Sequence, residues 1–187
     1  MQRTALAGAL AALLVPNLVL AEMSYSNVEV NYVDVELDGP GNVDGDGLEI
    51  AGSFEINSRV FVFGEWQDQN LDFGIDGREI EIGGGIRHSF SDKVDFFGSL
   101  SFVDAKVDTT FGSADDDGLA IGGGVRGKLS NQIELDAGIK YIDFDSGGDT
   151  GFSFGARYYF NPSMALGANA EFADNADTLR LGFRWEF

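Results

Sequence analysis

Apolar and polar residues alternate with a period of two along most of this chain. In residues 133–141, IELDAGIKY, the apolar side chains take every second position, and polar or small ones take the positions between. Successive side chains of a β-strand point to opposite faces, so the pattern predicts an amphipathic strand. The same rhythm recurs in residues 94–102, 152–160, 164–172 and 179–187, and less regularly in 48–56, 60–66, 80–90 and 119–129.

A further strand is predicted at about residues 25–37, but its alternation changes phase. Tyr32 and Val33 are adjacent bulky residues, so apolar side chains stand on opposite faces before and after this point. Two explanations fit the change: a β-bulge, or a strand that rises out of a membrane.

The connections between the predicted strands alternate between two kinds. Short ones fall at residues 57–58, 91–93, 130–132 and 161–163. Longer ones are rich in Asp and Gly, namely DGPGNVDGDG, DQNLDFGIDG, DTTFGSADDDG, DSGGD and ADNAD. This layout predicts an all-β fold, an antiparallel up-and-down transmembrane β-barrel of about ten strands, with eight strands as the alternative.

The first residues differ in composition from the rest of the chain. Arg3 gives a short positive start, an apolar run follows from Ala5 to Leu14, Pro16 interrupts it, and VLA ends the segment at Ala21. We predict that residues 1–21 are a cleaved Sec signal peptide, and that residues 22–187 form the barrel. Removal of the segment leaves 11 basic and 31 acidic residues, a net charge of −20, which argues against nucleic acid as a partner.

The two faces of the predicted strands favour a membrane barrel over a soluble one. Large aromatic residues gather near the strand ends of the apolar face, as interfacial girdles require. The opposite face carries charges of both signs, and a narrow polar interior needs such a balance because an unpaired enclosed charge costs several kcal/mol. The predicted lumen carboxylates are Glu49, Glu65, Glu79, Glu81, Glu134, Asp136, Glu171 and Glu186.

One six-residue pattern recurs four times, as GIRHSF, GVRGKL, GARYYF and GFRWEF. In each copy the glycine leaves room in the lumen, the arginine points inward, and the last apolar residue lies at the periplasmic interface. The repetition predicts a ring of lumen arginines in the periplasmic half, formed by Arg87, Arg126, Arg157 and Arg184.

The end of the chain carries a family resemblance. Arg180, Gly182, Trp185 and the C-terminal Phe187 resemble the assembly signal that outer-membrane barrels present to the barrel-assembly machinery. In architecture, residues 22–187 resemble the small OmpA/OmpX-like transmembrane barrels. SYSNVEVNYV, DGDGL and FVFGEW are also similar to a bacterial family once named for activating a plant immune receptor. The resemblance implies the bacterial outer membrane as location. It also implies membrane lipid and lipopolysaccharide as partners, with the assembly machinery and periplasmic chaperones during biogenesis.

The candidates for chemistry are few, and we predict neither an enzyme nor a cofactor. IGGGIR and IGGGVR lack the strand and helix context of a phosphate-binding loop, and the only histidine, His88, lies on the outward face. The aspartates in the predicted outer loops favour solvated acidic loops. The weaker alternative is a divalent cation shared with lipopolysaccharide phosphates. The aspartates concerned are Asp44, Asp46, Asp115, Asp116 and Asp117.

Two functions follow from this reading. The first is a structural or surface-interaction barrel with acidic extracellular loops, whose lumen is largely filled by charged side chains. The alternative is a narrow, porin-like channel for small solutes or ions, since ten strands leave slightly more room than eight. Along its path such a channel would present an acidic mouth and then a basic ring, which disfavours strong ion selectivity.

Overall fold

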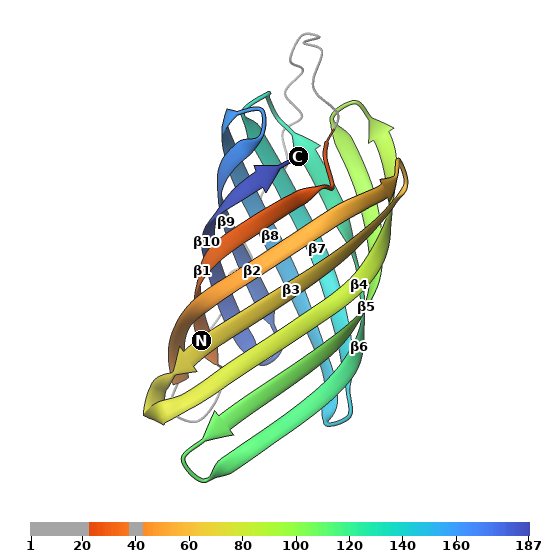
Figure 1. The fold of residues 1–187 in the computed structure, drawn as a ribbon. Helices are drawn as coiled ribbons and strands as arrows, with labels where there is room; N and C mark the ends of the chain where they lie inside the picture. Colours follow the sequence, from red (N-terminus) through yellow and green to blue (C-terminus); the bar gives the residue numbers. More distant parts are fainter. Residues whose placement is uncertain (1–22, 38–42) are drawn as a thin grey trace, which may run out of the picture.

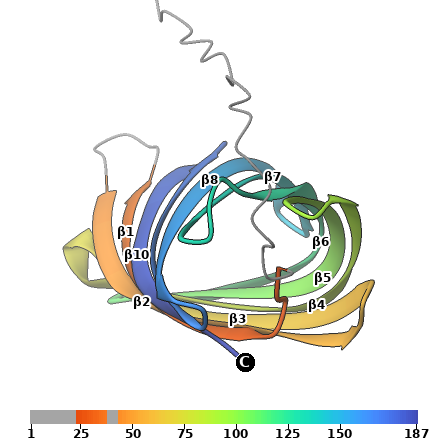
Figure 2. The same cartoon turned by 90° about the horizontal axis from the view of Figure 1, so that it is seen from above.

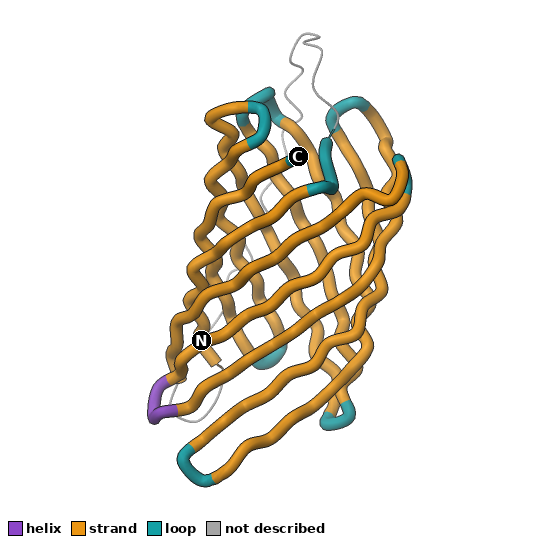
Figure 3. Tube along the Cα trace, viewed as in Figure 1, coloured by secondary structure: helices purple, strands orange, loops and turns teal. Residues whose placement is uncertain are grey.

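One antiparallel sheet closes on itself to form a ten-stranded barrel (Figures 1 and 3). The computed structural model describes residues 23–37 and 43–187, so the predicted signal peptide and part of the first predicted loop lie outside the described residues. Each strand pairs with the next along the chain, and β1 pairs with β10. The strands are β1 (Asn27–Leu37), β2 (Val43–Asn57), β3 (Val60–Leu71), β4 (Ile75–Ser91), β5 (Val94–Thr109), β6 (Gly112–Lys128), β7 (Ile133–Phe144), β8 (Gly147–Asn161), β9 (Met164–Ala173) and β10 (Ala176–Glu186). The predicted all-β fold and the count of ten strands are confirmed.

The two ends of the barrel differ. At the turn end, which the sequence predicts to face the periplasm, tight turns join β2 to β3, β4 to β5, β6 to β7 and β8 to β9. The turn end is at the top of Figure 1 and faces the viewer in Figure 2. The opposite hairpin end carries the remaining connections, among them the short 3-10 helix η1 (Asp72–Gly74). Within the described residues no helix is long and apolar enough to cross a membrane.

The strands are longer at the hairpin end than the sequence predicted. Most of the Asp- and Gly-rich segments continue the ladders: β3 runs to Leu71, β4 begins at Ile75, and only Thr110 and Phe111 separate β5 from β6. The prediction of long loops there was therefore wrong for the described residues. The reason is that the alternation of apolar and polar residues continues into these segments, but the apolar side chains now point inward and the polar ones outward. In β5 the buried Val103 points inward and the exposed Asp104 points outward, which is the pattern of a strand in water.

The same reversal explains the change of phase in β1. Val33 and Val35 are buried inside the barrel, whereas Asp34 and Glu36 are exposed on its outside. Pairing of β1 with both β2 and β10 is continuous, without a bulge. Of the two explanations, a strand that rises out of the membrane fits this register, and the prediction of a β-bulge was wrong. Register shifts occur instead near the turn end, in β2, β4 and β8.

Outward-facing side chains form an apolar belt around the barrel. Phe54, Phe102, Phe152 and Phe172 are about half exposed, as expected of side chains that contact lipid instead of a protein core. Near the turn end the rings of Trp185 and Phe187 lie 5.3 Å apart, centroid to centroid. The aromatic residues predicted for the apolar face accordingly point outward.

Glycines inside the barrel make room for phenylalanines. A Cβ atom on Gly83 would lie 2.7 Å from Cζ of Phe63, and one on Gly124 would lie 2.7 Å from Cζ of Phe97. The Gly124 pair matches the prediction that the glycine of the repeated pattern leaves room in the lumen. A Cβ atom on Gly155 would contact the carboxylate of Asp136 instead of an aromatic ring. The absence of a side chain at Gly155 therefore leaves room for the ion pair between Asp136 and Arg157.

Adding one methyl group inside the lumen tests this packing. A Cβ on Gly85 would lie 2.7 and 2.8 Å from two ring carbons of Phe61, so the Gly85→Ala variant is expected to lose about 1–3 kcal/mol of unfolding free energy. Gly84 is the matched control, because its Cβ would point outward with the nearest atom at 3.5 Å. Urea unfolding in lipid vesicles measures both. Equal stability of the two variants would contradict the assigned packing.

Candidate functional site

The lumen of the turn-end half contains an ion-pair network centred on Glu134. This side chain on β7 is 0 % exposed, and its Oε1 accepts hydrogen bonds from Arg126 on β6, at 2.9 Å from Nη2 and 3.2 Å from Nε. Nη1 of Arg157 and Nη1 of Arg184 lie 3.4 and 3.5 Å from the same oxygen. One carboxylate thus joins arginines from three strands, and such a group is stable in a buried site only while these partners are present.

Further carboxylates neutralise these arginines individually. Arg157 pairs with Asp136, and Arg184 pairs with Glu29 and lies 3.8 Å from Glu186. The hydroxyl of Tyr159 donates a 2.5 Å hydrogen bond to Glu186. The turn-end half therefore contains paired charges, and it does not form the basic constriction that the repeated glycine-arginine pattern suggested.

Arg87 stands apart from the other three predicted arginines. It lies 2.8 Å from Glu55 and 3.3 Å from Asp95, and its Nε donates to the carbonyl of Ser58. Its Nη1 donates a 2.9 Å hydrogen bond to the carbonyl oxygen of Met23. The four arginines all point into the lumen, and Arg87 belongs to a second group of contacts.

The segment that precedes β1 enters the lumen between these two groups. We call residues 23–26 the strap. The ring of Tyr25 lies between the guanidinium groups of Arg87 and Arg126, at 5.0 and 4.5 Å from its centroid, and 4.8 Å from the ring of Phe61. Burial raises the pKa of the Tyr25 hydroxyl, although the charge of Arg126 opposes this, and a neutral phenol ring suits two cation–π contacts.

The strap crosses the bore. Arg126 donates a 3.1 Å hydrogen bond to the carbonyl of Ser24. Its strand, β6, is five strands from β1 in either direction around the closed sheet, so the two strands lie on opposite walls. In Figure 2 the red segment before β1 leaves the wall and lies over the opening of the turn end.

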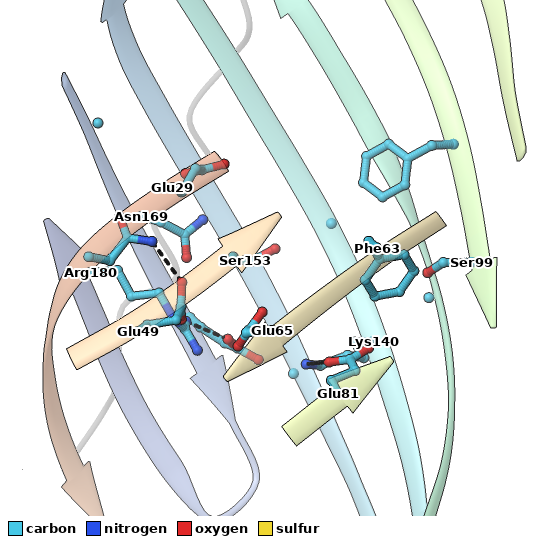
Figure 4. A pocket seen from close by; sticks show the side chains of 18 of the residues that line it. Glu29, Glu49, Phe63, Glu65, Glu81, Ser99, Lys140, Ser153, Asn169 and Arg180 are labelled. Atoms are coloured by element: carbon cyan, nitrogen blue, oxygen red, sulfur yellow. Dashed lines mark hydrogen bonds and ion pairs between the residues drawn. The ribbon is translucent and has the colours of Figure 1, made fainter. Parts of the chain in front are cut away.

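A second network lies nearer the hairpin end. Arg180 donates to Glu49 at 2.5 Å and to Glu171 at 2.8 Å, and Asn31 donates to the other oxygen of Glu49 at 2.7 Å. Across the lumen, Glu81 accepts a hydrogen bond from Lys140 at 3.1 Å (Figure 4). It also accepts one from Ser101 at 2.5 Å.

The eight predicted lumen carboxylates all lie on the inner face, but they differ in their contacts. Six take part in the ion pairs described above. Glu65 and Glu79 also point inward, yet neither makes an ion pair or hydrogen bond with any residue in the described part of the chain. Arg59 lies exposed in the β2–β3 turn.

Two cavities occupy the lumen between the networks. The larger has a volume of about 330 Å³ and lies between the Arg180 and Lys140 ion pairs, as Figure 4 shows. The smaller, about 210 Å³, reaches Tyr25 and the arginines of the turn-end network. Both are lined by Phe61, Phe63 and Phe97, so they adjoin along one aromatic wall.

Sequence reasoning missed two parts of this site. Glu29 was not among the predicted lumen carboxylates. It alternates with Val28 and Val30, so the period of two could have placed it inside, but the pattern could not show that it pairs with Arg184. The strap has no comparable signal. Tyr25 lies outside the regular alternation, and its contacts with Arg87 and Arg126 arise only when the sheet closes.

The other sequence candidates lie away from the lumen networks. Asp44 and Asp46 point outward from β2, and Asp115–Asp117 alternate along β6 at the hairpin end. Among the residues the structure describes, no group of three or more His, Cys, Asp or Glu side chains is arranged to hold a metal ion. His88 is exposed on the outer face of β4, opposite Phe96. Of the predicted assembly residues, Trp185 and Phe187 point outward, whereas Arg180 and Gly182 face the lumen.

Comparisons with known proteins agree with the closed barrel and its apolar belt. The family model described as the outer membrane protein beta-barrel domain matches residues 5–160. The chain belongs to the outer-membrane β-barrel family. Membership in this family implies the bacterial outer membrane as the location of the protein.

Solved outer-membrane barrels share the fold at low sequence identity. The translocator domain of the autotransporter NalP from Neisseria meningitidis is 11 % identical, with 90 % of this chain and 91 % of that chain covered and a TM-score of 0.54. The NanC porin is 9 % identical, with 87 % of this chain and 100 % of that chain covered and a TM-score of 0.50. Ail, the attachment invasion locus protein of Yersinia pestis, is 16 % identical, with 87 % of this chain and 97 % of that chain covered and a TM-score of 0.46. A search of curated proteins finds no match.

Proposed function

We propose that this outer-membrane barrel acts at the cell surface through its hairpin end, and that its lumen does not conduct solutes. The observation that carries the proposal is the strap: residues 23–26 cross the bore at the turn end and are bonded to Arg87 and Arg126 on the far wall. Two cation–π contacts and the packing of Tyr25 on Phe61 add to this attachment. A segment held at several points blocks the path that a permeating solute would need.

The hairpin end displays two large aromatic side chains to solvent. Phe111, at the tip of the β5–β6 hairpin that extends furthest in Figure 1, is 101 % exposed, and Phe73 in η1 is 80 % exposed. Phe73 has a φ of 65°, a left-handed conformation that is strained for a bulky residue. Strained backbone conformations cluster at functional surfaces, so the conformation of Phe73, together with a second exposed aromatic side chain at the same end, supports a surface-interaction role.

The alternative of a narrow channel is favoured by one observation, the two adjoining lumen cavities. They would become a path if the strap left the turn end, whereas a lumen filled throughout by side chains would offer none. Catalysis has no part in the proposal, because most inward carboxylates are ion-paired and His88 faces outward. Membrane lipid and lipopolysaccharide around the belt, and the assembly machinery and chaperones during biogenesis, complete the proposed partners.

An adhesion measurement tests the surface role. Expression in a non-adherent Gram-negative strain is expected to raise cell retention on protein-coated surfaces severalfold, and the Phe73→Ser/Phe111→Ser variant should return it to the level of the empty vector. Both side chains are on the outside of hairpin tips, so the double substitution should leave the barrel folded. The matched control is Val107→Ser, another exposed apolar residue of the β5–β6 hairpin. No gain over vector with surface-displayed wild type would contradict the proposal.

A further inference from the structure

The two cavities form one chamber with a distinct chemical character at each end. We call the combined space of the larger and smaller cavities the lumen chamber. Glu65 and the aromatic wall of Phe61, Phe63 and Phe97 line both parts. The volumes of about 330 and 210 Å³ fall together within the range of small-molecule sites, roughly 300–1,000 Å³.

The hairpin-end part of the chamber is acidic. Among the described residues, five carboxylates and three cations line the larger cavity, which leaves two negative charges in excess when all are ionised. Four of these carboxylates are already paired with arginine or lysine. Glu65 has no such partner among the described residues, so its carboxylate is the acceptor available to a positively charged group.

The turn-end part of the chamber offers an unused hydrogen-bond donor. The hydroxyl of Tyr25 has no hydrogen-bond partner, although the residue is only 4 % exposed, whereas Nη1 of Arg184 lies 3.5 Å from Glu134 and 3.8 Å from Glu186. Arg126, Arg157 and Arg184 line the same cavity, while Glu29 and Asp136 there pair with Arg184 and Arg157. Buried polar groups without partners are rare, and they indicate a bound water or ligand. A phenol donor beside guanidinium groups suits a carboxylate.

The wall between these ends is apolar. Phe61, Phe63 and Phe97 pack against lumen glycines, and the rings of Phe61 and Phe63 are 6.1 Å apart. An aliphatic body could bury its surface here, and a cation beside the rings would gain cation–π attraction.

We propose that the lumen chamber binds a small amino-acid-type zwitterion. Its ammonium group would lie against Glu65, its carboxylate would accept a hydrogen bond from the hydroxyl of Tyr25, and its aliphatic body would pack on Phe61, Phe63 and Phe97. The site is independent of the surface role, because it depends on lumen residues alone.

Calorimetric titration of the refolded barrel tests this inference with a series of ω-amino acids from 3-aminopropanoate to 8-aminooctanoate. Saturable binding is expected with an optimum at one chain length, since both charged ends must be reached together. The n-alkylamine and the n-alkanoate of matching length are expected to bind at least tenfold more weakly than the best zwitterion. Each ligand is also present during refolding in a parallel sample, so slow entry into a closed chamber does not hide binding.

Two conservative variants identify the ends. Glu65→Gln should weaken zwitterion binding at least tenfold and remove alkylamine binding while leaving the alkanoate unchanged. Tyr25→Phe, which keeps the ring and loses only the hydroxyl, should weaken the zwitterion and the alkanoate but not the amine. Asp143→Asn, on the exposed outer face of β7, is the control and should bind as wild type. Heats of dilution alone for every wild-type titration, or affinities unchanged in both variants, would overturn the proposal. Absence of binding heat in the titrations, together with increased cell retention in the adhesion measurement, would overturn the lumen site and leave the surface role intact.

Discussion

Replacement of Glu134 by glutamine is expected to lower the free energy of unfolding by about 3–5 kcal/mol, because it leaves buried arginines without their shared counter-charge. Glu134 is fully buried and contacts Arg126, Arg157 and Arg184 from three strands, so no water can replace it without rearrangement of the network. Urea unfolding of the refolded barrel in lipid vesicles measures the loss.

The central position of Glu134 gives this prediction a second, comparative part. Arg157→Gln should cost less than Glu134→Gln, because Glu134 keeps Arg126 and Arg184 after that substitution. Asp143→Asn, an equivalent change of charge on the exposed outer face, should stay within about 0.5 kcal/mol of wild type. A loss below about 1 kcal/mol for Glu134→Gln would show that the network is not centred on this carboxylate.

Removal of the strap is expected to convert a silent barrel into a conducting one. Deletion of residues 23–25 removes the Tyr25 ring and the carbonyl oxygens that Arg87 and Arg126 bond across the bore. The smaller cavity then adjoins the turn-end opening, and water and ions gain access to the chamber. In planar-bilayer recording the mean current through the deletion protein should rise at least tenfold over wild type.

A matched variant separates the effect of the strap from general damage to the barrel. Tyr25→Phe keeps the ring between Arg87 and Arg126, together with the backbone hydrogen bonds, so it should remain silent. Heat-modifiable gel migration verifies that both proteins are folded barrels. A folded deletion protein without current would mean that a second obstruction closes the lumen.

The fold was largely accessible from the sequence because its main determinant is local. A period of two records which side chains share a face, and ten such segments with alternating kinds of connection define an up-and-down barrel. The failure at the hairpin end has a physical cause. A strand alternates equally well in lipid and in water, so Asp104 and Asp143 belong to strands whose outer face has left the apolar zone. Only the reversed phase marks that boundary.

The site was accessible in part. Register alone placed Arg87, Arg126, Arg157 and Arg184 inside the barrel, because each follows an outward-facing residue within a strand. It could not give their partners, which depend on how the sheet closes. The contact between Arg126 and Ser24 joins residues 102 positions apart, and that between Arg180 and Glu49 joins residues 131 positions apart. No local pattern records such distances, so the strap and the network around Glu134 emerge only from the closed barrel.

Planar-bilayer recording of the wild-type protein tests the closed lumen most directly. The sample is refolded barrel whose folding is verified by a shift in gel migration between unheated and boiled protein. With the strap bonded to Arg87 and Arg126, the recording is expected to stay at the baseline of the bare bilayer over many insertions. Reproducible unitary conductance steps from this verified sample would contradict the closed lumen and establish the narrow channel in its place.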